Sequence, residues 1–501
     1  MQFSHYRKIS TRIPNDLNMQ ASKHILKIRS KYFKERNFSV VMTEIFQDIA
    51  NISALTGVQF LTSFVTLFRI IAGIVALMFI NWQLTLILIS IIPIKMFISN
   101  ILFKKQEAVY KIIMGIQSYF SSWIGESISG ITEIKMWGLI NKKLTDLAEI
   151  LEDNAKTKSR MMFYGYVDSL LGSSLTMLFT CVLYVYGAFL IIDGSMTIGM
   201  LVAFISYSSL VFEPVSIVSY IITQLSTTKP AFERFLKFLG TDAEVDDSEA
   251  IELDKTLEVK HIKFENVTLV YEQDKALDNV SFTINKGEKV AIIGLNGSGK
   301  SSLINLLLRF YEPSDGSIKI NDSSINEYTF ESYRSIWSLM SQSSYLFNDT
   351  IERNINITSD LSEKELLDSS RLSGALSFIE QLPEKFNTRV GYNGSKLSGG
   401  ERQKVALART MSKKNTKILL LDEATSSFDY SSEQLFNSEI LSSQNYDIML
   451  IVTHRPEILQ ILNKIIYLEN GKVAGVGTYD ELMQSSCNGF KNMLCKVQGG
   501  S

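Results

Sequence analysis

The sequence has little cysteine and histidine, with three of the first and four of the second among 501 residues. Cys181, Cys487 and Cys495 show no CxxC or Cys/His ligand spacing. We therefore expect neither disulfides nor metal sites built from thiolates. So few thiols in so long a chain are typical of a protein with a reducing, cytosolic side.

The chain also lacks an excess of charge of either sign. Its 50 basic and 52 acidic side chains leave a formal net charge of -2, so no broad positive field favours nucleic acid as a partner. The start, MQFSHYRKIS, carries basic residues with no apolar segment behind them, which predicts no cleavable signal peptide. Any insertion into a membrane must come from internal segments.

Long apolar runs are present, and all of them lie before about residue 222. A helix needs roughly 20 mainly apolar residues to cross the hydrocarbon layer. The stretches that qualify pair into two hairpins with short polar breaks, and they are 60–80, 84–102, 167–192 and 198–222. We predict a transmembrane domain over 1–238, with the intervening residues 103–166 forming cytoplasmic helices.

Basic residues set the orientation of these spans. Lys and Arg gather in the arm before residue 60 and between the two hairpins, which places both connections in the cytoplasm and the short breaks outside. Arg69, Lys95, Asp168 and Glu213 lie in or at the edges of the spans, where charge is costly. Such a residue can extend its charged end to the membrane interface or can line a polar path for the substrate. For Lys95 and Asp168 the first interpretation is favoured, and for Arg69 and Glu213 both stay open.

Beyond Phe238 the chain turns polar and acidic, which indicates a linker over 239–260 and a second domain over 261–501. The strand-like run Lys289–Ile293 leads into GLNGSGKS and then into a helical pattern, the order that a P-loop requires. Lys300 is predicted to contact the β and γ phosphates of ATP, and Ser301 to bind Mg²⁺. The predicted nucleotide-binding residues of this loop are Gly294, Leu295, Asn296, Gly297, Ser298, Gly299, Lys300, Ser301 and Ser302.

A second motif, ILLLDE, is an apolar strand that ends in two carboxylates. A buried parallel strand of this kind delivers an acid to the nucleotide, so Asp422 is predicted to orient Mg²⁺ and Glu423 to polarise the attacking water. The fold class predicted from both halves is an all-α transmembrane bundle followed by an α/β P-loop NTPase domain.

Between these motifs lies LSGGERQ, Leu397 to Gln403, which resembles the signature motif of ABC ATPases. The resemblance implies that Ser398, Gly399 and Gly400 contact ATP held by the P-loop of an opposing subunit. It also implies an adenine-stacking role for Tyr271. Further residues resemble family elements in order. Gln342 resembles the Q-loop glutamine, which implies a catalytic and Mg²⁺-binding role. Asp429 resembles the D-loop acid, with a nucleotide-binding role, and His454 resembles the switch histidine, with a catalytic role.

The membrane half resembles that of ABC exporter half-transporters in the segments 82–93, 126–138 and 193–207. That family has six spans per half, and the arm at 25–49 resembles its first cytoplasmic loop. The first two spans are therefore expected to be missing. Either the chain is a fragment, or its start site was misassigned, or a partner supplies these spans. The segment TRVGYNG is a further departure from the family. The family commonly has an acidic residue here that contacts the coupling helices, and this chain has Arg389 and Tyr392 instead.

The expected function is ATP-driven export across the bacterial cytoplasmic membrane by a multi-pass protein with a cytoplasmic ATPase domain. The resemblance implies a second half-transporter subunit; the intact Glu423 and LSGGE favour a homodimer and leave a heterodimer open. Membrane lipids surround the spans, and lipids, peptides and drugs all stay open as substrates. The alternatives are a truncated ATPase or regulatory remnant that transports nothing, and a soluble ABC ATPase acting on nucleic acid or ribosomes, which the spans disfavour.

Overall fold

The computed structural model describes residues 2–35, 38–212, 215–254, 256–271, 274–423, 438, 445–453, 455–485 and 488–498. The chain divides into two compact units, Met1–Ala243 and Glu244–Ser501. We call the first the helical unit and the second the sheet unit. The division falls within the predicted linker at 239–260.

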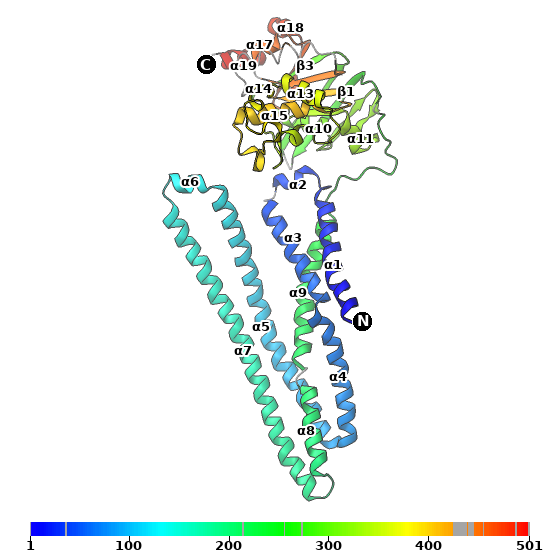
Figure 1. The fold of residues 1–501 in the computed structure, drawn as a ribbon, viewed down its shortest axis with the longest axis vertical. Helices are drawn as coiled ribbons and strands as arrows, with labels where there is room; N and C mark the ends of the chain where they lie inside the picture. The colour runs from blue at the N-terminus through cyan, green and yellow to red at the C-terminus, as the bar shows by residue number, and fades with distance from the viewer. Residues whose placement is uncertain are drawn as a thin grey trace. The chain divides into compact units, whose positions relative to one another are not determined.

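The helical unit consists of long helices joined by short turns (Figure 1). Their bounds are α1 Gln2–Ile25, α2 Ser30–Glu35, α3 Phe38–Ser53, α4 Val58–Ile80, α5 Trp82–Ser129, α6 Ile131–Met136, α7 Ile140–Ile192, α8 Ile198–Phe212 and α9 Val215–Leu239, with a 3₁₀ turn at Ala54–Thr56.

Three helical segments of the described chain are long and apolar enough to cross a membrane: Thr62–Ile80, Trp82–Ser129 and Ile140–Ile192. The last two continue well past the predicted spans and include most of the predicted cytoplasmic helices. Ile198–Ser209 is a shorter apolar helix. The predicted fourth span, 198–222, contains Glu213 and Pro214, which lie outside the described residues.

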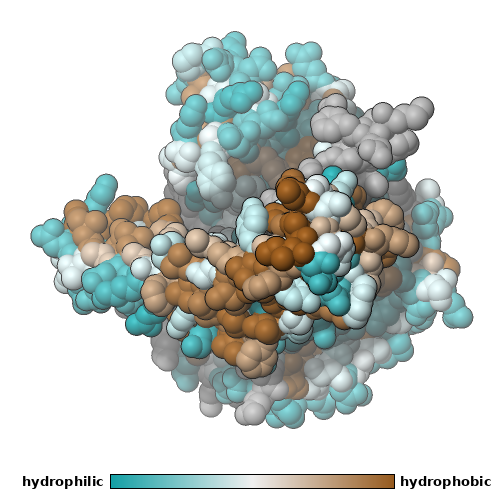
Figure 2. Space-filling model, turned by 90° about the horizontal axis from the view of Figure 1, so that it is seen from below, coloured by the Kyte–Doolittle hydropathy of each residue, from teal (hydrophilic) through white to brown (hydrophobic). Residues whose placement is uncertain are grey.

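The turn between α4 and α5 is tight because Asn81 caps both helices. Its backbone N–H donates to the Leu77 carbonyl, and its side-chain oxygen accepts from the Leu84 N–H at 3.0 Å. Buried Leu77, Leu84 and Phe179 are part of a core among α4, α5, α7 and α8. Much of the remaining apolar surface of the spans is exposed, and Figure 2 shows hydrophobic side chains gathered on it. Such a surface is typical of helices surrounded by lipid.

The sheet unit contains two sheets. A small antiparallel sheet has the order β2-β1-β4-β5, and a six-stranded sheet has the order β10-β9-β3-β8-β7-β6, with every pair parallel except β9–β10. The bounds are β1 His261–Tyr271, β2 Asp274–Asn285, β3 Lys289–Ile293, β4 Asp315–Ile320, β5 Ser323–Ser324, β6 Trp337–Met340, β7 Ile418–Asp422, β8 Ile448–Val452, β9 Lys464–Glu469 and β10 Lys472–Gly477.

Helices cover the larger sheet (Figure 1). They are α10 Lys300–Leu307, α11 Phe330–Ser335, α12 Ile351–Ile355, α13 Glu363–Leu372, α14 Leu376–Ile379, α15 Gly399–Ser412, α17 Pro456–Leu459, α18 Tyr479–Gln484 and α19 Asn488–Gln498. Every residue of β8, and all of β7 before Asp422, is buried. This explains why both strands read as continuous apolar runs, which is the pattern of central parallel strands.

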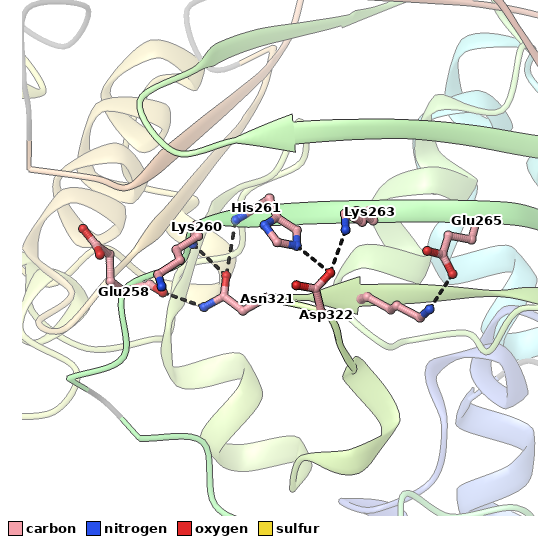
Figure 3. Close-up of polar contacts among 8 residues, drawn as sticks. Glu258, Lys260, His261, Lys263, Glu265, Asn321 and Asp322 are labelled. Atoms are coloured by element: carbon pink, nitrogen blue, oxygen red, sulfur yellow. Dashed lines mark hydrogen bonds and ion pairs between the residues drawn. The ribbon is translucent and has the colours of Figure 1, made fainter.

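Hydrogen bonds and an ion pair connect the start of β1 to the turn between β4 and β5 (Figure 3). The Asn321 side-chain oxygen accepts from the backbone N–H groups of Lys260 and His261 at 2.7 and 3.2 Å, and its amide donates to the Glu258 carbonyl at 2.6 Å. Asp322 pairs with Lys263 at 2.6 Å. These contacts fix the strand that carries Tyr271 at its other end.

Candidate functional site

The glycine-rich loop connects the end of β3 to the start of α10. Gly299 immediately precedes the helix, with φ at +103°. A Cβ at this position would meet Leu277 Cδ2 at 2.7 Å and the Ala276 carbonyl oxygen at 2.8 Å. Only glycine tolerates both the conformation and the contact. The loop thereby presents the N-terminus of α10, an arrangement suited to phosphate oxygens.

A cavity of about 260 Å³ lies beside this loop. It brings the P-loop together with the side chains that follow β6 and β7, although these elements are far apart in sequence. The carboxyl ends of neighbouring parallel strands meet at one edge of a sheet, which is where ligands bind in such folds. The lining residues are Ala276, Asn296, Gly297, Ser298, Gly299, Lys300, Ser301, Ser302, Gln342, Asp422, Glu423 and Val452.

Lys300 is half-buried at this cavity, and its ammonium donates to the carbonyls of Gly294 and Leu295 at 2.7 and 3.0 Å. Gly294 and Leu295 are the two predicted loop residues that do not line the cavity, and these contacts connect them to Lys300, which does. Burial lowers the pKa of the Lys300 ammonium, while the carboxylates of Glu423 and Asp422 act in the opposite direction.

The two carboxylates differ in their surroundings. Burial raises the pKa of Asp422, the neighbouring Glu423 raises it further, and Lys300 opposes both. Glu423 has φ at +50°, a conformation that is uncommon outside glycine, and its N–H donates to the Val452 carbonyl at 3.0 Å. The Gln342 amide donates to the Glu423 carboxylate at 2.7 Å. Two of the three predicted catalytic residues, Gln342 and Glu423, are therefore in direct contact.

Tyr271 does not line the cavity. It ends β1 and pairs with Asp274 of β2, two residues before Ala276 of the cavity wall. Its ring meets the Tyr311 ring edge to face, with centroids 5.1 Å apart and planes at 86°. No sequence pattern points to Tyr311, because its contact with Tyr271 joins two segments whose approach depends on the fold.

The signature residues lie apart from the cavity walls in this chain. Ser398 is the N-cap of α15, with its hydroxyl donating to the Glu401 carboxylate at 2.8 Å and the Glu401 N–H donating back to it at 3.3 Å. Ser398 and Gly399 are exposed, and Gly400 is half-buried. Asp429 and His454 lie outside the described residues, so their roles stay predictions.

In the helical unit, two of the four charged residues predicted near the spans, Lys95 and Asp168, lie near each other on α5 and α7. The Ser99 hydroxyl donates to the Asp168 carboxylate at 2.7 Å. Lys95 lies over Gly172, one helical turn from Asp168, and a Cβ there would be 3.8 Å from its ammonium. Arg69 is exposed on α4, and Glu213 lies outside the described residues.

Comparisons with known proteins match both units. A family model for the ABC transporter transmembrane region matches residues 1–215, and a model for the ABC transporter matches 277–426. The ABC transporter ATP-binding protein YknV of Bacillus subtilis (strain 168) is 30% identical over 479 residues, covering 93% of this chain and 78% of that protein. The ATP-dependent lipid A-core flippase of Syntrophus aciditrophicus (strain SB) is 28% identical, covering 95% and 79%.

The putative multidrug export ATP-binding/permease protein YgaD of Bacillus subtilis (strain 168) is 26% identical, covering 95% of this chain and 82% of that protein. Among solved structures, a bacterial Atm1-family ABC exporter with ATP bound has a similar fold. The TM-score is 0.86 at 23% sequence identity, over 98% of this chain and 86% of that one.

A helical membrane unit fused to a P-loop ATPase unit defines the class of ATP-driven membrane transporters. The chain belongs to the ABC transporter family, as an exporter half-transporter with one transmembrane region and one ABC ATPase domain. It hydrolyses ATP to drive export and resides in the membrane, with its ATPase domain in the cytoplasm.

Proposed function

We propose that two copies of this chain form the working exporter, and that each ATP binds between the P-loop of one copy and the signature motif of the other. The supporting observation from the signature side is the open space at Gly399, where a Cβ would meet no described residue beyond its own helical turn within 4 Å. Exposed backbone at the start of α15 leaves room for a phosphate and a second chain to approach. Because Glu423 and LSGGE occur together in one chain, two copies would form two complete sites.

On the P-loop side, the donor set suits ATP with Mg²⁺. Ser301, Gln342 and Asp422 contribute a hydroxyl, an amide oxygen and a carboxylate to one cavity. Mg²⁺ is commonly bound by one or two carboxylates together with phosphates and water, so this set fits once a nucleotide is present. Bound there, Mg²⁺ would neutralise charge on the phosphates. Lys300 would contact the β and γ phosphates.

Glu423 is the proposed acceptor of the proton from the attacking water. Gln342 donates a hydrogen bond to this carboxylate and so holds its orientation. His454 and Asp429 are proposed, from their place in the family motifs, to complete the site. The reaction is transfer of a phosphoryl group to water, with no covalent enzyme intermediate.

For the substrate, we propose a hydrophobic or amphipathic molecule, such as a lipid, a peptide or a drug-like compound. The spans expose many large apolar side chains, among them Phe64, Phe68, Phe97 and Phe189. One relative is named as a lipid A-core flippase and another as a putative multidrug exporter. A lipid and drug-like compounds are both among the proposed kinds of substrate. Membrane lipids are the expected neighbours of the same surface.

The observation that carries the proposed site is the convergence of Lys300, Gln342, Asp422 and Glu423 on one cavity. Replacing Glu423→Gln should lower ATP turnover about 100-fold or more, because the proton acceptor is lost. Binding of ATP, measured by equilibrium dialysis of the purified protein, should be retained. Glu380→Gln, at an exposed position away from the cavity, is the matched control. Undiminished hydrolysis in the Glu423 variant would remove this residue from its role.

A further inference from the structure

We infer that Tyr311 is a positioning residue for the nucleotide base, because it holds the ring of Tyr271 in a fixed orientation. This inference rests on the proposed function, in which Tyr271 stacks on adenine. The two rings form an edge-to-face pair with centroids 5.1 Å apart. That geometry is favourable for aromatic rings, since the positive edge of one meets the negative face of the other.

Tyr311 is itself held by the end of the P-loop helix. The chain leaves α10 through Arg309, which has φ at +54°. The N–H groups of Phe310 and Tyr311 then both donate to the Asn305 carbonyl, at 2.8 and 3.4 Å. Since α10 begins at Lys300, one helix connects the phosphate contacts to the residue that supports the base.

The loop that carries Tyr311 is also joined to the strand that carries Tyr271. The Ser314 N–H donates to the Thr268 carbonyl at 2.8 Å, and the Val270 N–H donates to the Ser314 hydroxyl at 3.1 Å. Both tyrosine rings are partly buried against the core of the sheet unit. These contacts fix the two backbones, and the ring pair restricts the Tyr271 side chain together with its packing against the core.

A preset ring has a specific consequence for binding. A stacking platform whose rotamer is already fixed loses less side-chain entropy when a base binds. The benefit applies only to ligands that carry a base. A base-free polyphosphate contacts the P-loop alone and gains nothing from Tyr311.

The test uses the full-length purified protein and compares ATP with inorganic tripolyphosphate as a competitive inhibitor. Tyr311→Ala should raise KM for ATP about 3- to 10-fold, the range that an aromatic pair contributes. We expect kcat to change less than about twofold, with the Ki of tripolyphosphate unchanged. Tyr311→Phe keeps the ring and should restore KM. Tyr271→Ala, measured in parallel, should raise KM at least as much as Tyr311→Ala.

The outcomes separate the two proposals. If Tyr271→Ala raises KM and Tyr311→Ala does not, the role of Tyr311 is refuted and the adenine role of Tyr271 stands. If Tyr271→Ala leaves KM unchanged, both roles are refuted. An equal loss of tripolyphosphate and ATP affinity in Tyr311→Ala would show a general disturbance of the P-loop and overturn the positioning role. Should the alanine variant fail to fold, Tyr311→Leu keeps apolar volume without the ring, and the same criteria apply.

Discussion

An ion pair connects the turn before the P-loop strand to the neighbouring strand β9. The Lys464 ammonium lies 2.8 Å from both oxygens of Glu288, and the Asn285 backbone and side-chain N–H groups donate to the same carboxylate at 2.9 and 3.1 Å. Burial acts to raise the pKa of Glu288, but Lys464 and Asn285 outweigh it, and the pKa lies below its usual value. The ionised carboxylate therefore stabilises the fold.

Replacing Glu288→Gln should lower the free energy of unfolding at pH 7 by about 1–3 kcal/mol, because Lys464 loses its charged acceptor. Since the pKa of Glu288 is lower in the folded protein than in the unfolded chain, its contribution is present above the ordinary pKa of 4.5. It disappears as the pH falls through the folded-state value. The deficit of the variant should thus shrink on acidification, measured by thermal unfolding of the detergent-purified protein at several pH values.

Glu384→Gln is the control for this series, because Glu384 is exposed and has no ion pair among the described contacts. A deficit of the Glu288 variant that stayed constant from pH 7 to below 4.5 would contradict the assigned charge state.

Some residues of the site could be predicted from the sequence and others could not. The P-loop, Asp422 and Glu423 are contiguous motifs, and the order of strand, loop and helix places them at one sheet edge. The hydrogen bond from Gln342 to Glu423 and the ring pair of Tyr311 join residues 81 and 40 positions apart. Such contacts depend on side-chain packing between elements, which periodicity does not specify.

Among the elements, α5 and α7 form the longest pair of the helical unit, joined through α6 (Figure 1). Helix α5 continues unbroken past Pro93, as transmembrane helices can when neighbouring groups satisfy the freed carbonyl. The first three predicted spans and their continuation into 103–166 followed from apolar length and helical periodicity. The meeting of Ser99 with Asp168 did not, because it depends on the register between the two helices.

The polar contact between α5 and α7 predicts a stability effect at the level of the hairpin. Asp168→Ala should destabilise the protein by about 1–3 kcal/mol, since it removes the acceptor of the Ser99 hydroxyl and a carboxylate that lies near Lys95 in an apolar span. The double variant Lys95→Met with Asp168→Leu should recover most of that loss, because it removes both charges together. Thermal unfolding in detergent measures both the loss in the single variant and the recovery in the double variant. Ser99→Ala, which removes only a hydrogen bond, is the control.

An equal loss in the single and double variants would contradict this account, because it would show that the charges of Lys95 and Asp168 do not compensate each other.

For the whole molecule, the sequence distinguished a lipid-embedded half from an ATPase half by composition and motif order. What a single chain leaves open is the complete ATPase site, because Ser398 and Gly399 do not line the cavity that contains Lys300. A site shared between chains has no signal in the periodicity of either one. It follows here only from the family resemblance and from the open space at Gly399.

Mixing two inactive variants tests the shared site most directly. Lys300→Ala removes the phosphate contact, and Ser398→Arg blocks the signature end of α15, so each variant alone should lose at least about 90% of its ATPase activity. Co-expressed and purified together through different tags, a mixed pair contains one intact P-loop facing one intact signature motif. The account predicts that ATPase activity returns in the mixed pair, to about half that of the unmodified protein. A mixed pair as inactive as its parents would contradict a site formed by two chains.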